Sequence, residues 1–155
     1  MHFVPMRFRH YVNRCEMIEF FTGNVEMPEF DPGRIARWIE AVASEHGRRV
    51  GSVNYRFCDD EEIIEVNREF LGHDYYTDVI TFDNSSGMRI DGDILISLDT
   101  VASNALLVGA DYNRELMRVV IHGILHLCGI NDKGPGEREI MERHEDAALL
   151  MLERV

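Results

Sequence analysis

The sequence has no long apolar run: none of its stretches approaches the roughly 18 consecutive apolar residues that a membrane-spanning helix needs. Its N-terminus also lacks the continuous apolar segment of a secretory signal peptide. Both absences argue against a membrane protein and against a secreted one. We therefore expect a chain with no membrane partner.

Cysteine is scarce as well. The three cysteines, Cys15, Cys58 and Cys128, are odd in number and show no paired spacing. A small protein held together by disulfides has an even set of cysteines at regular spacings, so this pattern argues against such a framework. We expect reduced thiols and a cytoplasmic location.

Positive charge is also in short supply. The chain has 16 lysines and arginines against 28 aspartates and glutamates, which gives a formal net charge of −12. Such a balance argues against a protein that wraps duplex nucleic acid by electrostatic attraction. It still permits a locally positive cleft, and it suits a site that concentrates a divalent cation.

The size and composition predict one globular domain. At 155 residues, with 45% apolar and 28% charged residues, the chain can bury a single core. Residues 1–14 fit no periodic pattern, and we expect them to form a flexible N-terminal extension, with Met17 as an alternative start of translation. The folded domain is then expected to span residues 15–155.

Hydrophobic periodicity and helix caps predict mixed strands and helices. The expected strands are 17–21, 50–57, 78–82 and 93–98. The expected helices, counted with their capping residues, are 31–47, 59–72, a helix from Asp99 or Thr100 to Gly109, 113–129 and 137–152. This order predicts the α+β class, with a small central mixed sheet packed against several helices.

The clearest chemical signal is a pair of histidines four residues apart. His122 and His126 stand in an apolar helical run, so both imidazoles lie on one helix face. Gly129 can end that helix and turn the chain, which brings Asp132 back toward the histidines. Two nitrogens and one carboxylate oxygen suit one zinc ion per chain at the end of a helix, with a fourth position open to water.

Two alternatives to a zinc site remain open. The histidines could be ordinary core residues, although a buried imidazole pair without a metal leaves polar nitrogens to satisfy. Imidazole also binds nickel, copper or iron, so the residues do not identify the metal.

The spacing also resembles the metzincin zinc proteases, which have a His-Glu-x-x-His-x-x-Gly-x-x-His or Asp pattern. Those enzymes place a glutamate directly after the first histidine as the general base. Gly123 occupies that position here, and a glycine cannot accept a proton. The protease interpretation therefore loses its base.

With its flanking segments included, the chain resembles the YbeY family of metal-dependent endoribonucleases. The matching blocks, which follow the family's order from about residue 50 onward, are 57–63, 66–70 with Asp74 and 77–82, 92–97 and 122–129. The resemblance implies a YbeY-like metallohydrolase domain that cuts single-stranded RNA. It also implies a role in 16S rRNA 3′-end maturation and ribosome quality control, with the small ribosomal subunit and ribosomal proteins as partners.

The chain departs from the family pattern at two positions. Asp132 stands where the family usually has a third metal-binding histidine, and a carboxylate can bind zinc in that place. Leu71 stands where the family usually has an arginine, whose fork of donors would bind a phosphate. Arg68 or His73 could take over this contact, or either could be a solvated side chain at the end of a helix.

Other polar residues have a functional and a structural interpretation. Asp78 and Asp93 stand at strand starts and could support the metal ligands or belong to turns. Glu137 and Glu139 could be outer carboxylates, although favourable charge at a helix N-terminus explains them more simply. His144 is expected on a solvated helix face.

The sequence leaves the catalytic base and the substrate-binding residues unassigned. Two rival functions therefore stay open: a zinc-dependent hydrolase of peptides or small molecules, and a non-catalytic ribosome-assembly factor with a structural metal. RNA binding would require a local basic face. The candidates for such a face are Arg34, Arg37, Arg48, Arg49, Arg56 and Arg68.

Overall fold

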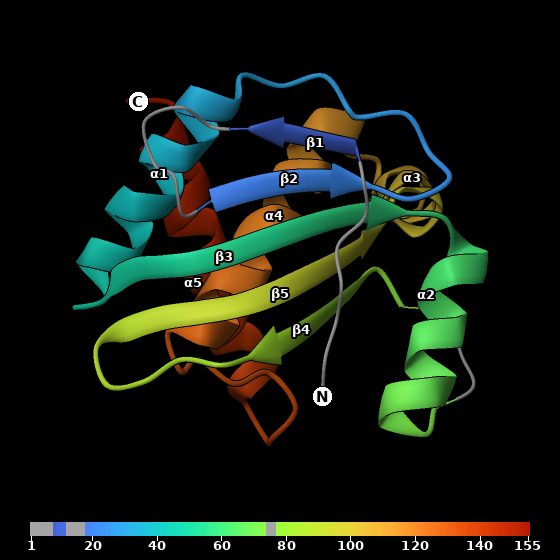
Figure 1. The fold of residues 1–155 in the computed structure, drawn as a ribbon. Coiled ribbons are helices and arrows are strands. Elements are labelled where there is room, and N and C mark those ends of the chain that lie inside the picture. Colours follow the sequence, from blue (N-terminus) through green and yellow to red (C-terminus); the bar gives the residue numbers. More distant parts are fainter. Residues whose placement is uncertain (1–7, 12–17, 74–76) are drawn as a thin grey trace.

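The computed structural model describes residues 8–11, 18–73 and 77–155, which form one mixed sheet with helices around it (Figure 1). The strands are β1 (Phe8–Tyr11), β2 (Ile18–Thr22), β3 (Arg49–Cys58), β4 (Val79–Asp83) and β5 (Arg89–Ser97). They lie in the order β1-β2-β3-β5-β4. The three central strands are parallel, and each edge strand is antiparallel to its neighbour. The predicted α+β class with a mixed sheet is confirmed.

The helices follow the sequence signals closely at most ends. They are α1 (Pro32–Glu45), α2 (Asp60–Val66), the π-helical turn η1 (Asn67–Leu71), α3 (Leu98–Val108), α4 (Tyr112–Leu127) and α5 (Glu137–Leu152). Asp31 caps α1 by accepting from the Arg34 backbone N–H at 3.2 Å, and Asp59 caps α2 by accepting from Glu62 at 2.9 Å. Both caps were expected from the sequence.

Several predicted boundaries are wrong. The helix expected to begin at Asp99 or Thr100 is capped by Ser97 and begins at Leu98. The prediction places the cap of the fourth helix at Asn113, but the Asp111 carboxylate accepts from the Arg114 backbone N–H at 3.2 Å, so the helix begins two residues earlier. The predicted strand 93–98 misses the first half of β5. Arg89 and Ile90 there continue the parallel pairing with β3, although this part of the sequence resembles a loop.

The structure describes only part of the N-terminal extension that the sequence predicts. Within the expected extension 1–14, the structure describes Phe8–Tyr11, which pairs with β2 as the edge strand β1. This strand was not predicted, because residues 1–14 of the sequence fit no periodic pattern. Residues 1–7 and 12–17 lie outside the described residues, so the division of the chain at residue 14 stays a prediction.

The main core lies between the sheet and helices α1, α4 and α5, which cover one face of the sheet (Figure 1). Successive residues of β5 show the two faces: Ile94 and Ile96 belong to the main core, whereas Leu95 joins a smaller cluster with residues of α2. Trp38 on α1 donates from Nε1 to the carbonyl of Ala148 on α5 at 2.7 Å. The packing therefore fixes α4 against β4 and β5, with α5 beside it.

Helix α4 approaches the sheet closely because it has a glycine at the contact. A side chain at Gly123 would place its Cβ 2.8 Å from Cδ1 of the fully buried Ile94. Gly123 therefore sets the distance between α4 and β5.

Across the described part of the chain, no helix has both the length and the apolar character required to cross a membrane.

Candidate metal centre

The structure brings the three predicted metal ligands together. His122 and His126 lie on successive turns of α4, and Gly129, with φ of 94°, lets the chain turn after the helix. Asp132 then returns, with its Oδ2 3.3 Å from His122 Nε2 and 3.4 Å from His126 Nε2. One ligand atom from each residue lies within 4.8 Å of the other two. That this group binds a metal stays a prediction.

The chemistry of this group suits a bound cation. Two imidazole nitrogens and a carboxylate oxygen are ligands that zinc accepts. The second oxygen of Asp132, Oδ1, is buried and has no hydrogen-bond partner, and an unpaired buried carboxylate oxygen is costly. Among the residues that the structure describes, no fourth histidine, cysteine or carboxylate joins the group. Three protein ligands leave a coordination position open.

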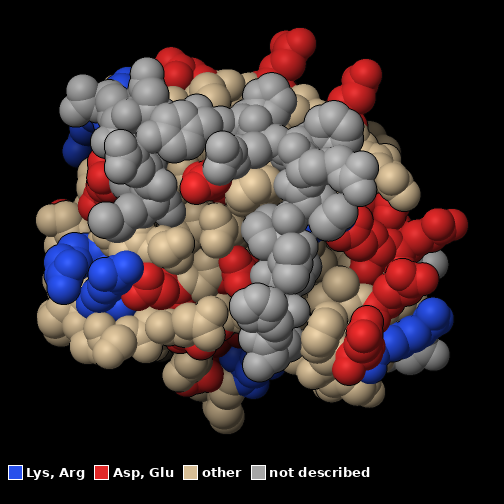
Figure 2. Space-filling view, viewed as in Figure 1, with Lys and Arg blue, Asp and Glu red and all other residues tan. Residues whose placement is uncertain are grey.

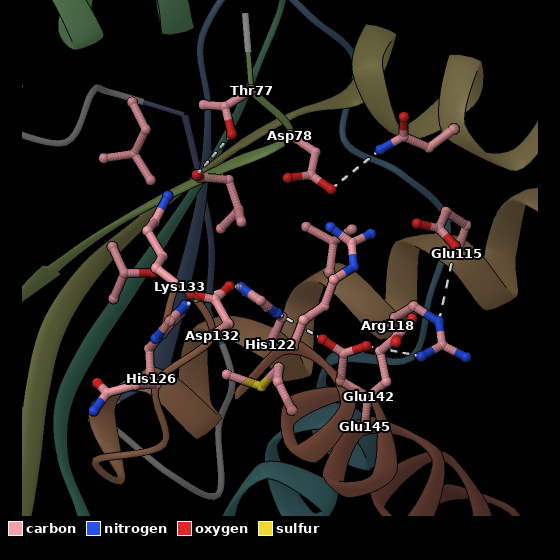
Figure 3. A pocket seen from close by; sticks show the side chains of 18 of the residues that line it. Thr77, Asp78, Glu115, Arg118, His122, His126, Asp132, Lys133, Glu142 and Glu145 are labelled. Atoms are coloured by element: carbon pink, nitrogen blue, oxygen red, sulfur yellow. Dashed lines mark hydrogen bonds and ion pairs between the residues drawn. The ribbon is translucent and has the colours of Figure 1, made fainter. Parts of the chain in front are cut away.

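Glu145 on α5 supports the site, and sequence reasoning missed it. Its side chain is buried, and Oε2 lies 2.6 Å from Nδ1 of His122. Its other oxygen accepts from Arg118 Nη1 at 2.8 Å, and Arg118 also donates to Asp146 at 2.9 Å (Figure 3). A carboxylate on Nδ1 fixes the tautomer of the ring and leaves Nε2 free to face a metal.

The two histidines have opposite pKa shifts. Burial alone would lower the pKa of His122, but the hydrogen bond and charge of Glu145, with the charges of Asp132 and Asp78, raise it above its usual value. Burial and the neighbouring His122 lower the pKa of His126, against a smaller opposing effect of Asp132. A lowered pKa keeps His126 neutral near pH 7, which is the form that binds a metal.

The signal for Glu145 was present in the sequence but was misread. Residues 142–145 are Glu-Arg-His-Glu and look like a solvated helix face. Glu145, however, lies four residues after the buried Met141 and four before the buried Leu149, on the apolar stripe of α5. His144, expected on the solvated face, is half-buried, and its ring centroid lies 5.0 Å from that of His46.

The three ligands line an open cleft with a volume of about 1090 Å³ (Figure 3). Asp78, from the start of β4, lines the same cleft and accepts from Asn104 Nδ2 at 3.2 Å. Burial raises the pKa of the Asp78 carboxyl, against the opposing effect of His122. Asp78 therefore lies where it could support the metal-ligand candidates, which was one of the two interpretations of this residue; the other was a role in a turn.

The other carboxylate candidates lie outside the cleft. Asp93 accepts from Asn54 Nδ2 at 3.1 Å, which joins two neighbouring strands of the sheet. Glu137 accepts from the Gly134 backbone N–H at 2.6 Å and so orders the loop before α5. Neither Glu137 nor Glu139 lines the cleft, so the simpler interpretation of both is favoured.

The departure at Leu71 leaves an apolar side chain in the cleft. Leu71 lies at the end of η1, lines the cleft and is 43% exposed. Of its two suggested substitutes, His73 lines the cleft and Arg68 does not. None of the six arginines considered for a basic face lines it. Arg34, for example, donates to the backbone carbonyls of Leu152 and Val155.

The buried position of Gly123 also excludes a protease-like base there. We expect Gly123→Val to lower the free energy of unfolding by about 1–3 kcal/mol, because the new side chain overpacks against Ile94. Urea denaturation measures this change. The Ile94→Val change removes the nearest methyl group, so the double variant should recover part of the loss. If Gly123→Val is as stable as the wild type, α4 does not depend on this close approach.

Comparisons of the sequence with known proteins identify relatives that match most of the chain. A family model described as endoribonuclease YbeY matches residues 21–153. A protein of that name from Parabacteroides distasonis is 55% identical over 135 residues, which cover 87% of this chain and 95% of the relative. The protein of that name from Phocaeicola vulgatus is 58% identical over 136 residues, or 88% and 99% of the two chains.

A solved structure shares the fold. The solution structure of a Thermotoga maritima protein matches with a TM-score of 0.61 and 28% sequence identity. The match covers 88% of this chain and 89% of that one. The sheet and helices that position His122, His126 and Asp132 therefore form an arrangement found in another protein.

Proposed function

The chain belongs to the YbeY endoribonuclease family, and from this premise we propose that it is a zinc-dependent endoribonuclease that cleaves single-stranded RNA. Its role is the maturation of the 16S rRNA 3′ end and ribosome quality control in the cytoplasm. The small ribosomal subunit, with its rRNA and ribosomal proteins, is the partner. The family membership supports these finer assignments.

One observation carries the proposal of a catalytic metal. The ligand atoms of His122, His126 and Asp132 converge in an open cleft, and only these three described residues form the group. A structural zinc site is usually closed by four protein ligands, whereas a catalytic site keeps one position for water or substrate. The geometry therefore favours an enzyme over an assembly factor with a structural metal.

Each residue of the site has a defined task. A zinc ion bound here would supply Lewis-acid activation of a phosphoryl oxygen and of a water molecule near neutral pH. His122 and His126 would hold the ion through their ring nitrogens, and Asp132 would hold it through a carboxylate oxygen. Glu145 orients the His122 ring from its other nitrogen. Asp132 also leaves the ion with less net positive charge than a third histidine would.

The rival hydrolase of peptides has no support from the site. In the proteases with a similar spacing, the base follows the first histidine. The equivalent residue here is Gly123, which is buried against Ile94 and has no side chain that could accept a proton. The chain as a whole instead matches, over most of its length, relatives that are named endoribonucleases.

Metal removal and substrate choice test the proposal. The full chain is stripped with a chelator, reloaded with zinc and given one RNA sequence as a single strand and as a duplex, together with the DNA single strand. An rRNA precursor with an extended 3′ end is the fourth substrate. We expect cleavage of the single-stranded RNA and of the precursor end, lost with the metal and restored by zinc. A zinc-loaded protein that cleaves neither the single-stranded RNA nor the rRNA precursor would overturn the proposal.

A further inference from the structure

The charge of the cleft poses a problem for an enzyme that binds RNA. Among the described residues that line it, aspartates and glutamates outnumber lysines and arginines. The wider surface has the same balance: Figure 2 shows acidic side chains spread over one face and basic side chains in a few separate groups. A polyanion entering this cleft therefore depends on the few cations that its walls supply.

Arg118 is one of three lysines or arginines among the described lining residues, but its charge is already used. It donates to Glu145 at 2.8 Å and to Asp146 at 2.9 Å, and Glu115 lies 3.9 Å away. Its guanidinium therefore holds the two helices α4 and α5 together behind His122. It is not available to a phosphate without giving up these partners.

Lys133 and Arg138 are the other two lysines or arginines in that lining. Both side chains are exposed, and within residues 8–11, 18–73 and 77–155 neither forms a hydrogen bond or an ion pair. Lys133 directly follows the metal-ligand candidate Asp132, and Figure 3 shows its side chain running along the cleft from there. Arg138 lies in the first turn of α5, on the far side of the same loop.

The loop between the two cations is held in place. Glu137 accepts from the Gly134 backbone N–H at 2.6 Å, which closes the loop from within. Gly136 has φ of 76°, a conformation that glycine adopts without strain, and it starts α5 directly afterwards. The loop therefore presents Lys133, directly after Asp132, and Arg138, in the first turn of α5, to the same cleft.

We propose that Lys133 and Arg138 bind backbone phosphates of the RNA next to the phosphodiester at the metal group. They take the place of the arginine that the family pattern has at Leu71. This inference rests on the proposed function. Lysine supplies a compact point charge and arginine a fork of donors, and both recognise phosphate. The contacts read no base, so they suit a strand of any sequence.

Binding measurements separate this inference from cleavage. The probe is a 2′-O-methyl single-stranded RNA, whose 2′-oxygens cannot attack the neighbouring phosphodiesters. It is bound to the zinc-loaded full chain over a range of salt concentrations, and a gel run after each titration checks that the strand is still intact. We expect Lys133→Ala and Arg138→Ala each to weaken binding on the order of tenfold. Each should also reduce the slope of log affinity against log salt by about 0.7, the loss of one phosphate contact. Zinc content should stay as in the wild type.

Two further variants sharpen the test. Arg143→Ala is the matched control, because Arg143 is an exposed arginine on α5 that does not line the cleft, and its binding should equal that of the wild type. Adding Leu71→Arg to Lys133→Ala should recover binding, since Leu71 is exposed within the same cleft. Recovery of binding would show that an arginine at position 71 and the lysine at position 133 can contact the same RNA strand.

The possible failures are distinguishable. If the wild type cleaves single-stranded RNA but both alanine variants bind the probe with unchanged affinity and salt slope, the inference is wrong and the proposed function stands. If the wild type binds the probe through these residues but cleaves no RNA, the proposed function fails and the phosphate contacts stand. An effect of Arg143→Ala as large as the other two would reduce the result to general charge and overturn the inference.

Discussion

Replacing His126 with alanine is expected to abolish the proposed zinc binding and to slow RNA cleavage by roughly a thousandfold. A metal contributes several kcal/mol to the stabilisation of a phosphoryl transition state, and each 1.4 kcal/mol is about a factor of ten. Zinc content by mass spectrometry and cleavage of a single-stranded RNA are measured on the same preparation. Thermal denaturation of the variant confirms that the helix still folds.

Asp132 gives this prediction its control. Asp132→Ala removes the third ligand and should lose zinc and cleavage together with His126→Ala. Asp132→His instead supplies the imidazole that the family pattern has at this position, so it should retain zinc and much of the activity. Stoichiometric zinc in Asp132→Ala would show that the carboxylate is not a ligand. Zinc retained in all three variants would place the metal elsewhere.

Local patterns in the sequence were enough to predict that His122, His126 and Asp132 lie together. His122 and His126 are one helical turn apart, and the turn at Gly129 returns Asp132 within a few residues. All the geometry that unites them is short-range, and the same is true of the caps at Asp31 and Asp59. Side chains close in sequence have few ways to be arranged, so spacing alone predicts their contacts.

Contacts between elements that are distant in the sequence could not be predicted from local patterns. Glu145 lies 23 residues from His122 and meets it only because α5 packs beside α4. Arg34 was considered for RNA binding, yet it donates to carbonyls at the other end of the chain, at Leu152 and Val155. Periodicity shows which side of a helix is apolar, but it does not show which other helix covers that side.

The composition was informative in a different way. A net charge of −12 argued against electrostatic wrapping of nucleic acid but allowed a locally positive cleft. The structure shows a cleft with few cations, and Lys133, which lies there, is the only lysine in the sequence. An overall charge limits the mode of binding, whereas the position of single charges requires the fold.

Glu145→Gln is expected to weaken zinc binding about 10- to 100-fold, the range found when a group that orients a metal ligand is altered. Glu145 accepts from His122 Nδ1 with one oxygen and from Arg118 with the other. Glutamine has a single acceptor oxygen, so it cannot serve both donors. Either the imidazole loses its fixed tautomer, or Arg118 faces an amide N–H. Competition with a chromophoric chelator measures the affinity.

Asp146→Asn is the matched control for this variant. Asp146 is 60% exposed and pairs with the same Arg118, but it does not touch His122. The change removes one charge from the same network, so a general effect of charge on zinc affinity would weaken both variants equally. We expect Asp146→Asn to bind zinc as the wild type does, because exposed ion pairs contribute little. Equal losses in the two variants would show that the buried Glu145 acts through its charge and not through the orientation of His122.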